Sequence, residues 1–183
     1  MKCIAIIPAR GGSKRLKGKN IYPLKGRPLI AYTIDACKAS AFISDIYVSS
    51  DDDTILEKAL AFGAIPLKRP EDLAADQTPK IVAIRHAAEK IAEEFGQIDI
   101  VIIPQANSPQ ISAHQIDQGV QLMLDHNLWE VMSTDENGVQ NAAFRIVKFH
   151  ALFNTFLSAH CGFVVAPNID VHTLEDIQFL ENR

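Results

Sequence analysis

Strand-like and helix-like segments alternate along almost the whole of this chain. The expected strands are residues 3–7, 45–49, 64–67, 98–103, 130–133 and 142–147, and the expected helices are residues 28–39, 51–62, 79–95, 113–126 and 173–181. Alternation at this spacing predicts an α/β fold, in which a mostly parallel, twisted sheet carries helices on both faces. The chain has 183 residues and no obvious linker, so we expect one domain that spans residues 1–183.

Polar segments that follow the expected strands are candidates for a binding site. The loop that begins at Arg10 follows the first strand, and Asp51, Arg69 and Gln105 follow the next three; Asp170 comes after the later ones. Open α/β sheets bind their ligands beyond the carboxyl ends of the strands. We therefore expect these segments to converge on one edge of the sheet.

Residues 10–20, called the basic loop below, concentrate positive charge. Within residues 10–19 lie five cations, namely Arg10, Lys14, Arg15, Lys17 and Lys19, although the net charge of the chain is −4. Gly11, Gly12 and Ser13 offer backbone N–H groups that a phosphate oxygen could approach. A nucleoside triphosphate fits this loop better than a nucleic acid, which needs a broad basic surface.

The basic loop matches neither common phosphate-binding pattern. It lacks the Gly-x-x-x-x-Gly-Lys-Ser/Thr spacing of the P-loop and the Gly-x-Gly-x-x-Gly spacing of dinucleotide-binding folds. The plain alternative is a solvated basic turn between a strand and a helix.

A run of acids, residues 51–53, opens the second expected helix. Ser50 is the expected N-cap of this helix, with Asp53 at its third position, where acids favour the first turn. A supporting role of this segment near a nucleotide remains open.

Composition indicates an ordinary soluble protein. Hydrophobic residues make up 48% of the chain and charged residues 22%, and no apolar stretch approaches the ~20 residues that span a bilayer. Met1 and Lys2 run directly into the first strand without an apolar signal segment. The three cysteines, Cys3, Cys37 and Cys161, are widely spaced and are expected to be buried free thiols. We expect a cytoplasmic protein that binds neither membranes nor nucleic acid.

Four segments carry a resemblance to a known family. They are IIPARGGSKRLKGKN at residues 6–20, LKGRPLIAYTI at 24–34, VSSDD at 48–52 and RPEDLAADQTP at 69–79. Together they resemble the acylneuraminate cytidylyltransferases, the CMP-sialic acid synthetases and their bacterial relatives that act on legionaminic and pseudaminic acids. Gln105 to Pro109 and Asp170 to Asp176 match this family less closely. The resemblance implies a Rossmann-like nucleotidyltransferase fold.

The resemblance also implies a role for each candidate site residue. The implied catalytic residues are Arg10, Lys14 and Lys19; the implied ligand-binding residues are Ser13, Asn20, Arg69, Gln105 and Arg145; and the implied metal ligand is Asp170, which would hold Mg²⁺. In the family, the first group and its neighbours cradle a triphosphate, the arginine corresponding to Arg69 lies near the base, and the glutamine corresponding to Gln105 contacts the sugar or base region. Arg145 would lie near the sugar pocket.

The sequence departs from the family pattern at several places, including the segment after Gln105, where the family's arginine is absent. Lys80 stands where the family tends to have a small hydroxyl residue, and His172 replaces the second acid of an Asp-x-Asp pair. Imidazole is a poor substitute for a carboxylate at Mg²⁺, which prefers oxygen ligands. Between Glu130 and Asp170 the chain is also shorter than in the family, so the arm that crosses a family dimer is reduced or absent. A homodimer remains open.

From these observations we expect a CTP-dependent cytidylyltransferase. The implied reaction transfers CMP from CTP to the anomeric hydroxyl of a nonulosonic, sialic-type sugar acid and releases pyrophosphate. One alternative is the same chemistry on another sugar acid, such as 3-deoxy-octulosonate. A second is a non-catalytic nucleotide-binding relative, which the departures at Lys80 and His172 suggest. A Rossmann-type dehydrogenase is disfavoured because the glycine fingerprint is missing.

Overall fold

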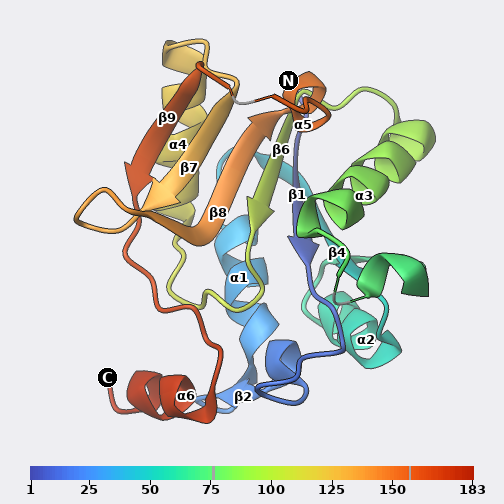
Figure 1. Ribbon diagram of the computed structural model, residues 1–183, viewed down its shortest axis with the longest axis vertical. Coiled ribbons are helices and arrows are strands. Elements are labelled where there is room, and N and C mark those ends of the chain that lie inside the picture. Colours follow the sequence, from blue (N-terminus) through green and yellow to red (C-terminus); the bar gives the residue numbers. More distant parts are fainter. Residues whose placement is uncertain (76, 157) are drawn as a thin grey trace.

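A seven-stranded sheet forms the centre of the computed structural model, which describes residues 1–75, 77–156 and 158–183 (Figure 1). The strand order is β5-β4-β1-β6-β8-β7-β9. These strands are β1 (Cys3–Pro8), β4 (Ile43–Ser50), β5 (Ile65–Lys68), β6 (Ile100–Pro104), β7 (Glu130–Thr134), β8 (Gln140–Lys148) and β9 (Cys161–Val165). A separate small sheet pairs β2 (Pro23–Leu24) with β3 (Arg27–Pro28).

Six of the seven strands of the main sheet run in the same direction. The β5, β4, β1 and β6 strands pair in parallel, whereas β8 runs antiparallel to both of its neighbours, β6 and β7; β7 and β9 are again parallel. The expected mostly parallel sheet is therefore confirmed. The reversal at β8 follows from the short hairpin that joins it to β7, since a tight turn can connect only antiparallel neighbours.

Helices cover both faces of the sheet, as expected. One face packs against α1 (Leu29–Lys38), α2 (Asp53–Ala61) and α4 (Ala113–Asp125), and the other against α3 (Lys80–Phe95) and α5 (Phe149–Leu152). Buried isoleucines of β1 alternate between the two cores, with Ile7 on the first face and Ile4 and Ile6 on the second. A continuous apolar run is required of a strand that is buried on both faces.

A third, smaller core lies beyond the main sheet. Here α6 (Leu174–Glu181) packs beside β2, and its Ile177 and Leu180 meet Leu16 of the basic loop. The helix begins with a capping box, in which Thr173 and Asp176 exchange side-chain and backbone hydrogen bonds. The basic loop is therefore anchored by apolar packing to the C-terminal segment.

Two expectations need correction at this level. The strand β9 was not predicted, because its Cys-Gly-Phe-Val-Val sequence is short and contains a glycine that weakens a strand pattern. Cys3 and Cys37 are buried free thiols as expected, but Cys161 on β9 is only half-buried. In the part of the chain that the structure describes, no helix has the length and apolar character needed to cross a membrane.

Candidate functional site

A cavity of about 670 Å³ lies beyond the carboxyl ends of the central strands, and we call it the strand-end cavity. Its walls come from five places: the loop after β1, the loop after β5, the first residue of α3, the loop after β6 and the segment between β9 and α6. Of the predicted site residues, it is lined by Arg10, Ser13, Lys14, Lys19, Asn20, Arg69 and Gln105. The structure thus brings together seven of the nine residues expected to form the site.

Hydrogen bonds within the basic loop fix its shape. The side chain of Asn20 is buried and donates from Nδ2 to the carbonyl oxygen of Arg10 at 2.9 Å, which joins the two ends of the loop. The Ser13 N–H donates to the Gly11 carbonyl at 2.8 Å. Gly18 adopts a left-handed conformation (φ 64°) at the start of η1 (Lys19–Ile21), where its missing side chain avoids strain. These contacts give the loop a defined shape, and four of its five cations, Arg10, Lys14, Arg15 and Lys19, line the cavity.

Lys19 lies deep in this group of cations. Burial, together with the positive charge of Arg15, lowers the pKa of Lys19, while the charge of Asp170 acts in the opposite direction. A cation that is held partly out of water among like charges is stabilised by an added anion. The strand-end cavity therefore has the electrostatic character of a polyanion site.

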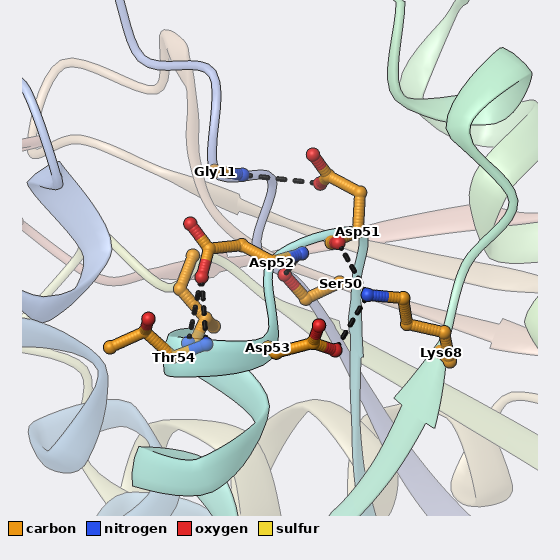
Figure 2. Close-up of polar contacts among 8 residues, drawn as sticks. Gly11, Ser50, Asp51, Asp52, Asp53, Thr54 and Lys68 are labelled. Atoms are coloured by element: carbon orange, nitrogen blue, oxygen red, sulfur yellow. Dashed lines mark hydrogen bonds and ion pairs between the residues drawn. The ribbon is translucent and has the colours of Figure 1, made fainter.

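Two walls of the cavity are joined by the last two residues of β4, Ser49 and Ser50, and by Asp51, which follows them; we call these three residues the β4 turn. Figure 2 shows Ser50 and Asp51 of this turn. The Ser49 carbonyl accepts from the Ala9 N–H at 3.0 Å, and the Ser50 carbonyl accepts from the Arg69 N–H at 2.8 Å. The Asp51 carboxylate accepts from the Gly11 N–H at 3.1 Å. The β1 and β5 sides of the cavity are thus held by the same three residues.

The expected N-cap of α2 was wrong by two residues. Asp52, not Ser50, caps this helix, and its Oδ1 accepts from the N–H groups of Thr54 (2.8 Å) and Ile55 (3.3 Å). The reason is that β4 continues through Ser50, so the chain must still turn before the helix can begin at Asp53. Ser50 instead accepts the Asp52 N–H on its hydroxyl oxygen at 3.0 Å, which shapes that turn.

Arg69 is a buried arginine at the edge of the cavity. Only 5% of the residue is exposed, and one guanidinium nitrogen donates to the Ser49 carbonyl at 2.8 Å. Its Nε is buried and has no hydrogen-bond partner among residues 1–75, 77–156 and 158–183. Burial lowers the pKa of this guanidinium, and a buried unpaired donor is costly unless a ligand satisfies it. Arg69 therefore offers a fixed donor to a bound molecule.

Gln105 and Lys80 meet across the cavity. Lys80, the first residue of α3, donates from Nζ to Gln105 Oε1 at 2.6 Å, and the Gln105 carbonyl accepts from the Thr33 hydroxyl at 2.9 Å. Burial lowers the pKa of Lys80. A cation at a helix N-terminus opposes the helix dipole, so its location is unfavourable for α3 itself. Because Lys80 occupies Oε1, the amide nitrogen of Gln105 is left to act as the donor toward a ligand.

Asp170 lies next to the lining of the cavity, and its charge acts on both Lys19 and Lys80. Its Oδ1 accepts from the Ser108 hydroxyl and from the Asn168 side-chain amide, the latter at 2.8 Å. His172 lines the cavity two residues later. Burial and the nearby cations Lys19 and Arg15 lower the pKa of His172, which favours a neutral imidazole.

These residues fit a metal site only in part. Within the described ranges, no group of three or more histidine, cysteine or acidic side chains could hold a metal ion. Mg²⁺, however, is commonly bound by one or two carboxylates, with substrate phosphates and water completing its octahedron. Asp170 has one carboxylate oxygen engaged by Ser108 and Asn168, so it fits a site that the substrate would complete.

Arg145 is not brought to the cavity. It lies on β8, where its Nε pairs with Glu130 Oε1 of β7 at 2.5 Å. Its backbone stands opposite Ile103 and Met132 in the sheet register, and its side chain pairs with Glu130 instead of lining the cavity. Nothing in the sequence between residues 130 and 150 indicated this register.

Sequence reasoning also missed part of the cavity wall. The segment after β5 contributes Leu73, Ala74, Ala75 and Thr78, the first two from η2 (Glu71–Ala74). Asn107 lines the cavity from the loop after β6. Two signals could have found them: their position directly after strands, and the family resemblance over residues 69–79 and 105–109.

Fold and site together define a class of protein. An open, mostly parallel α/β sheet carries a cation-rich cavity at its strand ends, with an apolar wall beside it, as in proteins that bind nucleotides through their phosphates. The family model described as "Cytidylyltransferase" matches residues 4–159. This chain belongs to the cytidylyltransferase family.

Relatives with curated names support this assignment. The chain is 36% identical over 127 residues to a pseudaminic acid cytidylyltransferase of Campylobacter jejuni, which covers 69% of this chain and 55% of that protein. It is 39% identical over 127 residues to a CMP-N,N'-diacetyllegionaminic acid synthase of Legionella pneumophila, which covers 67% of this chain and 53% of that protein. The chain thus spans about half the length of these relatives.

A solved structure shares the fold. A CMP:2-keto-3-deoxy-manno-octonic acid synthetase, solved in complex with CTP, superposes with a TM-score of 0.82 and covers 100% of this chain and 98% of that one. The two sequences are 16% identical, so the likeness is one of fold. The expected nucleotidyltransferase architecture is confirmed by this comparison.

Proposed function

We propose that this chain transfers CMP from CTP to the anomeric hydroxyl of a nonulosonic, sialic-type sugar acid and releases pyrophosphate. The observation that carries the proposal is the strand-end cavity, where the basic loop, Arg69 and Gln105 face a single space. Membership of the cytidylyltransferase family and the names of the two relatives support CTP and an acidic sugar as the substrates. Because the reaction consumes CTP, we place the protein in the cytoplasm.

In this proposal the basic loop binds the triphosphate. The sugar hydroxyl oxygen attacks the α-phosphorus and loses its proton, while the bond between the α-phosphorus and the bridging oxygen breaks and pyrophosphate leaves. Negative charge builds on the departing phosphates, and Arg10, Lys14 and Lys19 would neutralise it. Ser13 and Asn20 would hold the triphosphate and the shape of the loop, respectively.

The other residues orient the two substrates. Arg69, with its unpaired Nε, would donate to the nucleotide base, and Gln105 would donate to the sugar from its amide nitrogen. Asp170 would hold Mg²⁺, which when bound adds positive charge at the phosphates. We leave Arg145 out of this site because its guanidinium pairs with Glu130 on the sheet.

The test is pyrophosphate release in the presence of CTP and Mg²⁺ with a panel of sugar acids: N-acetylneuraminic, legionaminic, pseudaminic and 3-deoxy-manno-octulosonic acids. Release that requires both CTP and a nonulosonic acid supports the proposal. Release with 3-deoxy-manno-octulosonic acid alone would assign the chain to the alternative substrate, which a relative 33% identical over 125 residues and named 3-deoxy-manno-octulosonate cytidylyltransferase favours.

A non-catalytic nucleotide-binding protein is the second candidate function. Two residues in the lining of the cavity favour this candidate. Lys80 stands where the family resemblance implies a hydroxyl residue, and His172 stands where it implies an acid. Tight binding of CTP without pyrophosphate release from any sugar acid would support this candidate and contradict the transferase.

A further inference from the structure

We propose that Asp51 is a positioning residue that holds the basic loop in its anion-binding shape. The inference rests on the proposed function in one respect, namely that the ligand of the loop is a triphosphate. Asp51 is an acid, so it carries the same sign of charge as the ligand it would help to bind. The contacts of its neighbours show why an acid stands there.

The carboxylates of the three consecutive acids that follow β4 have three different partners, although Lys68 also donates to the backbone carbonyl of Asp51 at 2.8 Å (Figure 2). Asp52 accepts the N–H groups of Thr54 and Ile55 and so caps α2, and Asp53 pairs with Lys68 at 2.6 Å. The carboxylate of Asp51 points away from both and accepts the Gly11 N–H at 3.1 Å. Asp51 is therefore not needed for the helix cap or for the ion pair.

The Asp51 contact ties the basic loop to the β4 turn. Gly11 is the second residue of the loop, and its carbonyl in turn accepts the Ser13 N–H at 2.8 Å. The charge of Asp51 also acts on Arg69, whose N–H and guanidinium donate to Ser50 and Ser49 of the same turn. One carboxylate thus restrains the loop from β1 and attracts the arginine from β5.

A positioning role and a bystander role predict opposite changes in triphosphate affinity when the Asp51 carboxylate is removed. If Asp51 were merely an acid near the cavity, its removal would strengthen the binding of a triphosphate, because a repulsive charge would be gone. If Asp51 positions the loop, its removal lets Gly11 and the adjoining backbone move. Binding must then order this backbone, and the lost conformational entropy reduces the affinity. The triphosphate would bind more weakly even though the site has become more positive.

The experiment compares Asp51→Ala, Asp51→Asn and the matched control Asp53→Ala by calorimetric titration. The probes are CTP and inorganic triphosphate, which reports on the loop without the base or the sugar. We expect Asp51→Ala to weaken both probes about tenfold, in line with loss of a hydrogen bond to a charged group. Asp51→Asn keeps an acceptor for the Gly11 N–H, so its affinity for both probes should lie within about threefold of that of the unchanged protein. The affinity of Asp53→Ala should equal that of the unchanged protein.

A second readout separates positioning from a general loss of stability. Hydrogen exchange of residues 9–20 should become faster in Asp51→Ala and stay unchanged in Asp53→Ala, while the core strands remain protected in both. Equal or tighter binding of inorganic triphosphate by Asp51→Ala would overturn the proposal. Binding of inorganic triphosphate without preference for CTP would contradict the proposed function alone, and failure of the unchanged protein to bind either probe would overturn both.

Discussion

Gly11 and Gly12 are neighbours in the basic loop, but only Gly12 has room for a side chain. A Cβ atom on Gly11 would lie 2.6 Å from Asp52 Oδ2 and 2.7 Å from Asp52 Cβ. Around Gly12, no atom of the described residues lies within 4 Å of such a Cβ. The close approach of the loop to the N-cap of α2 therefore requires glycine at position 11.

We expect Gly11→Ala to displace either the loop or the cap. Loss of stability of about 1–2 kcal/mol is expected from a displaced N-cap, together with at least several-fold weaker binding of CTP. Gly12→Ala is the matched control and should leave the melting temperature unchanged. Thermal unfolding and CTP titration of both variants check this, and identical behaviour of the two variants would contradict the geometry described above.

Lys19 and Lys80 make CTP binding depend on pH. Burial lowers the pKa of both lysines, whereas a bound triphosphate favours their charged forms. The complex then binds more protons than the free protein at alkaline pH, so affinity falls as pH rises toward the usual lysine range. Titrations from pH 7 upward should show this fall, and Lys80→Met should show a smaller one.

The titration of these two lysines does not lower the stability of the free protein at alkaline pH, so unfolding does not explain the fall in CTP affinity. Because the folded-state pKa of each lysine is lowered, the unfolded chain binds more protons in the window between that pKa and the usual lysine value. In this window these two groups make the free protein more stable as pH rises. Constant affinity from neutral to alkaline pH would therefore mean that neither lysine faces the ligand.

The sequence predicted the basic loop at residue level because its signal is local. Five cations and three glycines lie within residues 10–19, and such a cluster of cations on a chain of net negative charge indicates an anion as the ligand. Arg145 could not be placed in the same way. Its location depends on the register of β8 against β6 and β7, and register is set by distant strands.

At the scale of elements, the N-cap of α2 makes the clearest prediction. Asp52→Ala removes the acceptor for two N–H groups, and we expect a loss of about 1 kcal/mol in the free energy of unfolding. Asp53→Ala is the control, because its pair with Lys68 is exposed and such pairs contribute little. Urea unfolding measures both; an equal loss in the two variants would show that Asp52 does not act as the cap.

Elements were predictable where the pattern is strong and local. The run Cys3–Pro8 is almost wholly buried, as its apolar sequence indicated, and the helix expected over residues 173–181 forms as α6, with Thr173 as its N-cap. The start of α2 was misplaced because Ser50 and Asp52 are both good N-caps, and the extent of β4 decides between them. The strand β9 was missed because it depends on pairing with β7 and not on its own sequence.

At the scale of the whole molecule, the candidate site belongs to one side of the sheet. The strand-end cavity gathers the loops that follow β1, β5 and β6, together with His172 from the segment after β9, while the strands β7, β8 and β9 themselves lie at the other side of the sheet order. The family resemblance is strongest in the same half of the chain. Under the proposed function, most of the assigned residues bind the nucleotide, whereas fewer are assigned to the sugar, and Gln105 is the clearest of these.

The measurement that tests this account most directly is calorimetric titration of the unchanged protein with CTP, ATP, GTP and UTP, each with and without Mg²⁺. The account predicts CTP binding in the micromolar range that Mg²⁺ strengthens, with the other nucleotides at least about tenfold weaker, a difference of about 1.4 kcal/mol. An Arg10→Ala, Lys14→Ala variant should lose this binding. Equal binding of all four nucleotides, or binding of none, would contradict the claim that the strand-end cavity is a CTP site.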